Sequence, residues 1–408
     1  MTIYDAVVVG SGPAGSTAAR CLARAGASVL LLDRARFPHD KPCGGAITVR
    51  AASCQEMDLS PVVERTITGV RFSLRLGPAF DRRYEEPLTY MTQRCRLDAY
   101  LAEGAVAAGA AFRDGEPVRA LEVASNPGPA GGRAGSSLTR ATTVRTEHGS
   151  YAARAVIGAD GANGVVGRAA GLRPQTEEAV ALEGNVPCPE GVPQAWQEVA
   201  GLDLGGLAGG YGWVFPKGDH LNVGVGAWKY AAFTLRPKLA ALCRRYGFDP
   251  EGLEGLRGHH LPVRVPGSTI ARGPVALVGD AAGLVDPLSG EGIHMAFLSG
   301  RLASEAVLRF LAGEAEGLSA YQRAVDRRLQ PELTASRKLQ ELFHFAPPPY
   351  VAVVCRNERF WGFFCHLIRG ERTYLDFLRM IGPLRLAVDF FAAAAQRRRL
   401  ARLAAAGR

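Results

Sequence analysis

The sequence lacks paired cysteines, a long apolar run and an N-terminal leader pattern, and each absence excludes a class of protein. Its eight cysteines are scattered, and no two have the C-x-x-C spacing, which argues against a disulfide framework, a zinc site and a dithiol-type flavin reductase. We therefore expect no metal site and a reducing, cytoplasmic setting. No stretch of about 18 uninterrupted apolar residues exists, so no transmembrane helix is predicted, and the first apolar run is too short for a signal peptide.

Composition and charge are those of a soluble globular protein with a basic end. Of the 408 residues, 47% are hydrophobic and 21% are charged, which allows a large core and two or three structural units. The net charge is +9, and the segment after Asp389 contains no acid but holds Arg397, Arg398, Arg399, Arg402 and Arg408. No nucleic-acid recognition motif is found, so we expect no nucleic-acid partner. An anionic membrane surface, contacted through the C-terminal region, is the better candidate.

The N-terminal residues have the pattern of a dinucleotide-binding unit. An apolar run at 6–9 predicts a strand buried on both faces, and a helical pattern follows through residues 18–23. Between them, Gly10 permits a tight turn, Gly12 lets the backbone approach a pyrophosphate, and Gly15 lets helix and strand pack closely. The helix N-terminus offers free N–H groups to phosphate oxygens. The alternative is a glycine-rich turn that binds nothing.

A second strand, predicted at 28–32, ends at Asp33, where a carboxylate is placed to accept hydrogen bonds from an adenosine ribose. Such an acid favours a ribose with a free 2′-hydroxyl, and therefore FAD or NAD over NADP.

Two later segments also place an acid after an apolar strand. Residues 155–158 lead to Asp160, and residues 275–278 lead to Asp280. A helix predicted at about 292–311 follows, and its N-terminus would face a phosphate or a polar ring edge. Three visits to one nucleotide-binding unit fit a large cofactor held along its length, and no second glycine motif for NADPH is found, so FAD is favoured over NAD.

The three motifs together resemble the flavoprotein family of aromatic hydroxylases, and within it most closely the geranylgeranyl reductases. The resemblance covers residues 4–312 and rests on Lys-Pro-Cys-Gly-Gly at 41–45 and on Tyr-x-Trp-x-Phe-Pro followed by Asn-Val-Gly-x-Gly at 211–226. It implies that FAD is the cofactor, that Asp280 contacts the ribityl chain and that Arg94 contacts the flavin nucleotide. It also implies that reduced FAD saturates isoprenoid double bonds of a lipid, a prenylquinone or a chlorophyll side chain. The external electron donor is then NADPH or a ferredoxin-type carrier.

The predicted fold class is α/β, with a Rossmann-type FAD-binding domain, an interleaved antiparallel β-sheet substrate domain and a C-terminal helical region. The predicted boundaries are 1–60 with 92–170 and 271–312 for the FAD-binding domain, 61–91 with 171–270 for the substrate domain, and 313–408 for the helical region.

The residues assigned to FAD follow the three motifs and the loop after Asp33. They are Gly10, Gly12, Ala14, Gly15, Asp33, Arg34, Cys43, Gly44, Gly45, Ala46, Arg94, Asp160, Gly161, Gly279, Asp280, Pro287, Gly290, Gly292 and Ile293.

The segment 211–226 is the predicted substrate wall. Alternation along a strand puts Tyr211, Trp213 and Phe215 on one face, and the return strand presents Gly224 and Gly226. Aromatic rings beside a strip without side chains suit a long apolar chain or a flat ring, and sheet core is the alternative.

Three residues are predicted to be catalytic, namely Cys43, Tyr211 and Trp213. Cys43 lies between a proline and a glycine pair, where packing gives little reason for a thiol; ordinary packing of a small residue is the alternative. An isolated alkene needs a hydride, which reduced flavin gives from N5, and a proton, for which Cys43 or a water that it positions is the hypothesis.

Two other functions stay open. A flavin monooxygenase or halogenase would act on an aromatic substrate, but only five lysines occur and Lys41 is the one near the flavin motifs, which disfavours halogenation. A flavoprotein that carries prenyl lipid without reducing it is the non-enzymatic alternative.

A surface loop and a set of C-terminal helices are also predicted. A flexible surface loop with no assigned function is predicted at 126–137. One or two helices are predicted at 318–345, ended by the prolines at 347–349. The aromatic, basic-ended remainder suits a lid over a lipid tunnel at a membrane surface, with ordinary helix packing as the alternative.

Overall fold

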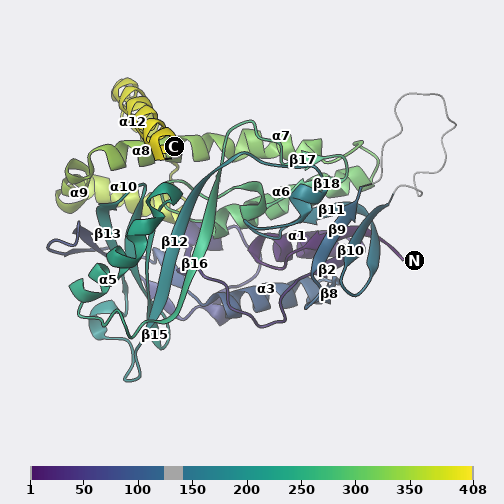
Figure 1. The fold of residues 1–408 in the computed structure, drawn as a ribbon, viewed down its shortest axis with the longest axis horizontal. Coiled ribbons are helices and arrows are strands. Elements are labelled where there is room, and N and C mark those ends of the chain that lie inside the picture. Colours follow the sequence, from purple (N-terminus) through teal and green to yellow (C-terminus); the bar gives the residue numbers. More distant parts are fainter. Residues whose placement is uncertain (1, 124–140, 407–408) are drawn as a thin grey trace.

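The computed structural model describes residues 2–123 and 141–406. The loop predicted at 126–137 lies outside these residues. The two large sheets occupy opposite ends of the long axis of the molecule, and the helices α7 and α8 run along one side (Figure 1). The predicted α/β class, with parallel and antiparallel sheets and C-terminal helices, is confirmed.

The first sheet is built around the N-terminal strand. β1 (Ile3–Val9) is parallel to β2 (Val29–Leu32) on one side and to β11 (Ser150–Gly158) on the other. Five more strands complete the sheet: β8 (Ala111–Arg113), β9 (Val118–Glu122), β10 (Thr142–Thr146), β17 (Ala271–Arg272) and β18 (Val275–Leu277). All four residues of β2 are buried, as expected for a parallel strand covered on both faces, which explains its uninterrupted apolar sequence.

Three long helices pack with this sheet. They are α1 (Pro13–Arg24), α3 (Arg94–Ala107) and α6 (Ile293–Leu311), and α1 contacts both of the others. α3 begins at Arg94, and this places Arg94 and Asp98 one helical turn apart on one face.

The second sheet has seven strands in the order β16-β12-β15-β14-β13-β5-β6. Neighbours are antiparallel except for the parallel pair of β13 and β5. The strands are β5 (Gly69–Leu74), β6 (Phe80–Arg83), β12 (Thr176–Pro187), β13 (Val199–Leu207), β14 (Gly210–Pro216), β15 (His220–Trp228) and β16 (Glu254–Arg264). One face packs on α5 (Leu235–Arg245), and the other face is left for the cavity described below.

Short elements join the two sheets. A three-stranded sheet consists of β3 (Ala46–Thr48), β4 (Arg65–Ile67) and β7 (Thr89–Met91). The short α-helices are α2 (Val49–Ala52) and α4 (Val166–Ala169). The 3-10 helices are Ser60–Val62, Gln194–Trp196, Lys229–Thr234 and Gly279–Ala282.

Six helices follow α6. They are α7 (Ser319–Arg328), α8 (Gln330–Phe345), α9 (Pro347–Arg356), α10 (Glu358–Arg369), α11 (Tyr374–Met380) and α12 (Leu384–Ala406). The prolines at 347–349 follow the end of α8 as predicted, but they also form the first turn of α9, where a missing N–H costs nothing. Within residues 2–123 and 141–406, no helix is both long and apolar enough to cross a membrane.

Candidate active site

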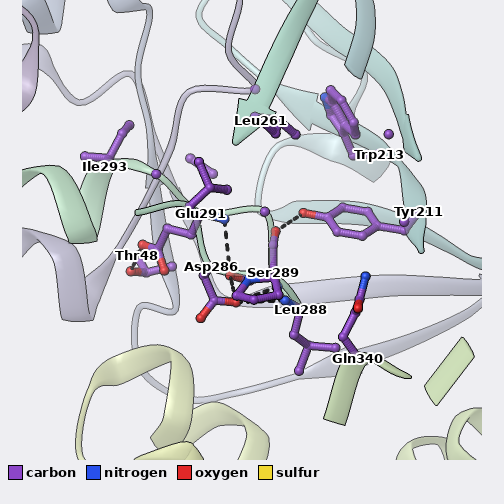
Figure 2. Close-up of a pocket in the computed structure, with 18 of the residues that line it drawn as sticks. Thr48, Tyr211, Trp213, Leu261, Asp286, Leu288, Ser289, Glu291, Ile293 and Gln340 are labelled. Carbon is purple, nitrogen blue, oxygen red and sulfur yellow. Dashed lines mark hydrogen bonds between the residues drawn. The ribbon is translucent and has the colours of Figure 1, made fainter. Parts of the chain in front are cut away.

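A cavity of about 710 Å³ runs from the N-terminal glycine loop, between the two sheets, to the C-terminal helices. Figure 2 shows part of its lining, with Trp213 and Tyr211 from the second sheet facing the loop that carries Ser289 and Glu291. The cavity brings together most of the residues predicted to hold FAD. Those that line it are Gly12, Ala14, Cys43, Gly44, Gly45, Ala46, Arg94, Gly161, Gly279, Asp280, Pro287, Gly290, Gly292 and Ile293.

Five predicted FAD residues do not line the cavity, and two of them, Gly10 and Gly15, shape the glycine loop. Gly10 has a φ of 100°, and a Cβ there would lie 2.3 Å from the carbonyl oxygen of Ala159. A Cβ on Gly15 would lie 1.8 Å from the carbonyl oxygen of Gly10. Only glycine therefore lets β1, β11 and α1 approach this closely.

Asp33 ends β2 and holds the glycine loop. Its Oδ2 accepts hydrogen bonds from the backbone N–H of Ser11 at 2.7 Å and from the hydroxyl of Ser11 at 2.8 Å. A carboxylate has about four acceptor sites, so lone pairs remain for a ribose hydroxyl. Its neighbour Arg34 is exposed.

Arg94 lies against the glycine loop. Its Nη2 is 3.6 Å from the position that a Cβ on Gly12 would take. It donates two hydrogen bonds to Asp98, at 2.8 and 2.6 Å. Burial disfavours the guanidinium charge, but Asp98 more than offsets this and raises the pKa of Arg94. Arg94 is therefore a fixed cation beside the loop that would carry the pyrophosphate.

The second motif, at Asp160 and Gly161, contributes backbone atoms to the cavity lining more than side-chain atoms. Gly161 lines the cavity with a φ of 77°, whereas Asp160 lies behind it and accepts hydrogen bonds from the N–H groups of Val165 and Val166. Burial raises the pKa of Asp160, and its Oδ1 has no hydrogen-bond partner among the described residues.

In the third motif, Asp280 is the carboxylate that faces the cavity. Its Oδ2 lies 3.4 Å from Nζ of Lys41 and 3.5 Å from Nε2 of His259. Burial opposes its ionisation, yet Lys41, His259 and Arg94 together lower the pKa of Asp280. It is an ionised acceptor suited to a hydroxylated chain.

The loop 41–46 packs against the aromatic strand, and two of its positions have room only for glycine. A Cβ on Gly44 would lie 2.9 Å from Cδ2 of Phe215, and Gly45 has a φ of 61°. The carbonyl oxygen of Gly44 accepts a hydrogen bond from Nζ of Lys217 at 2.5 Å. The N–H of Gly45 lies 3.4 Å from the sulfur of Cys43. These contacts fix the position of the Cys43 thiol.

The predicted alternation of β14 and β15 is observed. Trp213 pairs with Gly224, and a Cβ on Gly224 would lie 2.1 Å from Cζ2 of the indole, so the ring covers this glycine. Gly226 lines the cavity. On the opposite face, Val214 and Val223 pack in the core formed with α5.

The three predicted aromatic residues line the cavity as a row. The indole N–H of Trp213 donates to Oδ1 of Asn222 at 2.8 Å. The Tyr211 hydroxyl donates to the carbonyl oxygen of Ser289, a bond drawn in Figure 2. Burial raises the pKa of Tyr211, so its proton stays in this bond. Tyr211 therefore holds the flavin-motif loop against β14, and Phe215 continues the row toward Gly44.

Two buried ionisable residues beside Cys43 were missed from the sequence. Lys217 is 2% exposed, and burial lowers its pKa to about 8. The expectation that Lys41 is the only lysine near the flavin motifs is therefore wrong, because Lys217 follows the aromatic strand and turns back toward Gly44. Glu183 on β12 is 7% exposed, and burial raises its pKa to about 7. Its place in the period-two series with Ala179 and Ala181 was the available signal.

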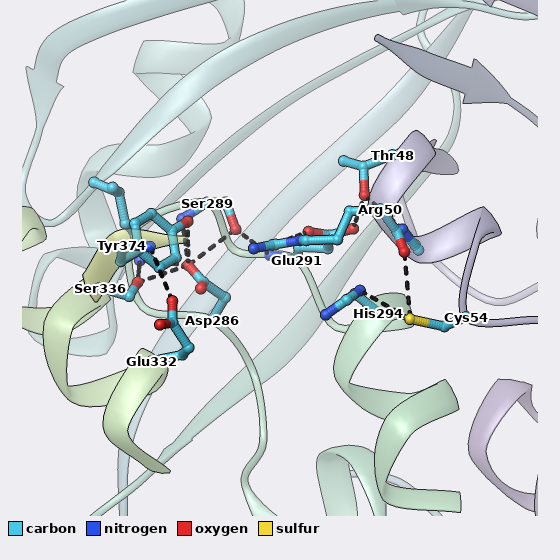
Figure 3. Close-up of polar contacts among 12 residues, drawn as sticks. Thr48, Arg50, Cys54, Asp286, Ser289, Glu291, His294, Glu332, Ser336 and Tyr374 are labelled. Atoms are coloured by element: carbon cyan, nitrogen blue, oxygen red, sulfur yellow. Dashed lines mark hydrogen bonds and ion pairs between the residues drawn. The ribbon is translucent and has the colours of Figure 1, made fainter. Parts of the chain in front are cut away.

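Asp286 connects the flavin-motif loop to the C-terminal helices, as Figure 3 shows. Its Oδ1 accepts hydrogen bonds from the backbone N–H of Ser289 at 2.9 Å and from the Ser336 hydroxyl of α8 at 2.8 Å, and the Tyr374 hydroxyl of α11 lies 3.4 Å away. Glu291 of the same loop accepts hydrogen bonds from Thr48 and Arg50. These bonds join parts of the chain that lie far apart in sequence.

The C-terminal helices form the far end of the cavity with apolar side chains. Their lining residues include Leu342, Phe343, Tyr350, Phe363, Phe377 and Val388. Arg399, one of the five arginines after Asp389, is not a free surface charge. It is 6% exposed, and its guanidinium donates to Glu341 at 2.7 Å and to Glu177 at 3.0 Å.

The residues present fit FAD. A glycine loop that excludes side chains, a helix N-terminus at Pro13, a fixed cation at Arg94 and an ionised acceptor at Asp280 converge on one elongated cavity. The site is therefore chemically complementary to a dinucleotide with a polyhydroxylated linker.

Comparison with known proteins agrees with this fit. Residues 3–202 match the family described as FAD binding domain. The chain is 33% identical over 363 residues to the chloroplastic geranylgeranyl diphosphate reductase of Oryza sativa subsp. japonica, covering 83% of this chain and 74% of that protein. It is 36% identical over 323 residues to the menaquinone reductase of Mycobacterium tuberculosis, covering 74% and 76%.

A solved structure gives the same result. A geranylgeranyl bacteriochlorophyll reductase-like protein from Thermoplasma acidophilum superposes with a TM-score of 0.70 and 25% identity, covering 84% of this chain and 87% of that chain. The chain therefore belongs to the geranylgeranyl reductase family of FAD-dependent oxidoreductases, with FAD as its cofactor.

Proposed function

We propose that this enzyme saturates carbon–carbon double bonds in the prenyl chain of a lipid or prenylquinone. The observation that carries the proposal is the continuity of the cavity, which leads from the flavin motifs past Trp213 to apolar side chains of the C-terminal helices. Reduced FAD, when bound, supplies a hydride from N5. The protein must align an alkene, exclude water and deliver a proton.

The proposed roles of the residues follow from their positions. The FAD residues assigned from the sequence hold the cofactor, with Arg94 and Asp280 as its charged contacts. Tyr211, Trp213 and Phe215, with Gly224 and Gly226 beside them, form the wall along which the prenyl chain lies. This wall excludes water from the alkene, because Trp213 is 8% exposed and both neighbouring rings pack on it. Cys43 lies at the end of this wall, in a loop fixed by its glycines.

The charge pattern of the cavity supports a neutral prenyl chain. Among the described lining residues, the strong cations are already paired with acids: Lys41 with Asp280, Arg50 with Glu291 and Arg94 with Asp98. A diphosphate brought deep into the cavity would find no unpaired strong cation there. We therefore favour a substrate whose polar group stays near the cavity mouth, such as a prenylquinone, over one that buries an ionised group.

The outer face of the C-terminal helices supports a contact with a membrane. Leu386, Phe390 and Phe391 of α12 are exposed, with 69% of Phe390 accessible, and Arg397 and Arg398 are exposed on the same helix. Exposed apolar and basic side chains on one helix suit an anionic lipid surface. We infer that lipid substrate enters from such a surface, and that NADPH or a ferredoxin-type carrier reduces the flavin.

The test is a direct assay of the flavin. The purified protein is photoreduced without oxygen, and geranylgeranyl lipids, prenylquinones and geranylgeranyl-chlorophyll are added in turn while the flavin spectrum is recorded. We expect a prenylquinone or prenyl lipid to reoxidise the flavin and to appear in its saturated form by mass spectrometry. If none of them is reduced, the proposal is wrong, and the carrier function without chemistry becomes the better account.

Lys217 favours one alternative, a halogenase or monooxygenase acting on an aromatic substrate. A buried amine whose pKa is lowered to about 8 is a group that oxygen-dependent flavin chemistry could use. Its Nζ is, however, held by the carbonyl oxygen of Gly44. Aerobic turnover with NADPH and bromide, giving a brominated or hydroxylated aromatic product, would establish this alternative.

A further inference from the structure

Glu183 has a defined position in the strand pairing of the second sheet. β12 pairs Glu183 with Gly224 of β15, and β14 pairs Trp213 with the same glycine. Paired residues on neighbouring strands point to the same face of a sheet. The Glu183 carboxyl group and the Trp213 indole therefore share the cavity face, on either side of a residue that has no side chain.

The two oxygens of this carboxyl group have different surroundings. Oε1 accepts a hydrogen bond from the backbone N–H of Cys43 at 2.5 Å. Within the described residues only Oε1 of Glu183 takes part in a hydrogen bond, and Glu183 lines the cavity. One oxygen is thus anchored to the Cys43 loop, and the other is free to carry a proton.

The charged groups around Glu183 do not form an ion pair with it within the described residues. Those that face it are Lys217 after β14, Arg94 on α3 and Asp40 before the 41–46 loop, whereas Cys43 contributes only its backbone N–H. On β16, Arg257 is its strand partner, but the guanidinium of Arg257 pairs with Asp40 at 3.1 Å. Burial outweighs the N–H bond and the charge of Lys217, so the pKa rises to about 7 and the acid is largely neutral below that pH.

We propose that Glu183 donates the proton in the reduction, from Oε2 to one carbon of the alkene. This inference rests on the proposed function. The π electron pair forms the new C–H bond with the Glu183 proton, and the other carbon takes the hydride that reduced FAD supplies. The substrate gains two electrons and two hydrogens, FAD is reoxidised, and the Glu183 carboxylate regains its proton from water.

Other acids at the site are less suited to this step. The Tyr211 hydroxyl is committed to the carbonyl oxygen of Ser289, and Nζ of Lys217 is committed to that of Gly44. Cys43 is fixed by its loop, and its backbone orients Glu183. Cys43 therefore becomes a positioning residue for Glu183 in addition to its predicted place in the cavity.

The test compares Glu183→Gln with Glu178→Gln, a control on the same strand whose side chain is exposed and pairs with Lys229. Both variants are loaded with FAD, photoreduced anaerobically and mixed with prenylquinone over a range of pH. We expect Glu183→Gln to retain FAD and the KM for quinone but to lose about 100-fold in flavin reoxidation rate. The decline of the wild-type rate above about pH 7 should disappear from the residual activity, and Glu183→Asp should recover part of the rate.

A second measurement does not depend on turnover. Infrared difference spectra of the FAD-loaded protein between pH 5 and pH 9 should show a protonated carboxylic acid band that shifts in D₂O, and this band should be weaker in Glu183→Gln than in wild type and Glu178→Gln. The inference is overturned if Glu183→Gln reduces quinone at the wild-type rate, or if the acid band is as strong in that variant as in wild type. Failure of the proposed function is distinguishable, because the wild-type flavin itself would then not be reoxidised by any prenyl lipid.

Discussion

The two walls of the cavity are built from different parts of the chain. The nucleotide wall consists mainly of backbone: glycines at fixed short spacings bring β1, β11 and α1 into contact. The opposite wall consists of side chains from β12, β14, the 41–46 loop and the C-terminal helices, which are distant in sequence. In the first wall, a Cβ added at Gly10 or Gly15 would collide with backbone, whereas the second wall presents the side chains to which we assign substrate binding and proton transfer.

The largest expected effect is a loss of FAD binding, caused by a substitution in the nucleotide wall. Gly10→Ala places a Cβ 2.3 Å from the carbonyl oxygen of Ala159, so backbone must shift. We expect the variant to be isolated without flavin, with FAD affinity reduced at least about 100-fold, or close to 3 kcal/mol. Flavin absorbance per protein and FAD titration measure this.

The matched control is Gly26→Ala, because Gly26 also has a positive φ but has no atom within 4 Å of the added Cβ. It should lose about 1 kcal/mol of stability and retain FAD. Equal flavin content in the two variants would contradict the backbone description of this wall.

Gly224→Val breaks the side-chain wall without touching the nucleotide. The added atoms begin 2.1 Å from Cζ2 of Trp213, so the indole must move into the cavity. We expect normal flavin content and a loss of about 100-fold in flavin reoxidation by prenylquinone, as for a misplaced substrate.

Gly226→Ala should cause a much smaller loss, because its Cβ would lie 3.8 Å from the same indole. If Gly224→Val instead loses its flavin, the two walls are not separable and the comparison fails.

An effect of intermediate size is expected on the free energy of unfolding, and it concerns Glu183. Its pKa is about 7 in the folded protein and 4.5 in the reference state, so the folded state binds the extra proton between these values. The associated stability is fully present below pH 4.5 and is lost as pH rises through 7. Between pH 5 and pH 8, wild type should lose on the order of 2 kcal/mol more than Glu183→Gln in urea unfolding. If the free energy of unfolding depends on pH in the same way in wild type and Glu183→Gln, Glu183 is not a buried neutral acid.

The smallest effect concerns the outer side of the C-terminal helices. Phe390→Asp should weaken binding to anionic vesicles about tenfold, through loss of one inserted ring. Phe233→Asp is the control, since Phe233 is 83% exposed but lies beside α5, in the 3-10 helix Lys229–Thr234. Vesicle sedimentation measures both, and equal losses would argue against a specific membrane face.

The residues of the nucleotide wall could be predicted from the sequence, because the contacts that form this wall join residues that are close together in the chain. Gly10, Gly12 and Gly15 act within a few residues of one another, and Asp33 and Asp280 follow the strands that position them. The alternation of β14 was also local, since a period of two needs no knowledge of the partner strand.

The side-chain wall was less predictable because it depends on strand pairing. Glu183 meets the Cys43 loop only through the position of β12 beside β15, which no short segment specifies. The turn after β14 sends Lys217 back to Gly44, although its sequence suggests a surface lysine. Arg399 lies among other arginines in a basic segment, and only its tertiary contacts with two acids explain its burial.

The burial of Arg399 has a consequence for how the chain can be shortened. Glu177 belongs to β12, the strand that also carries Glu183, and Glu341 belongs to α8. A truncation from the C-terminal end keeps these contacts only if it leaves Arg399 in place. Beyond that point two carboxylates would lose their shared counterion, and Arg337 alone would remain beside Glu177. A fusion partner or an affinity tag is therefore better joined at the N-terminus than in place of the final helical turns.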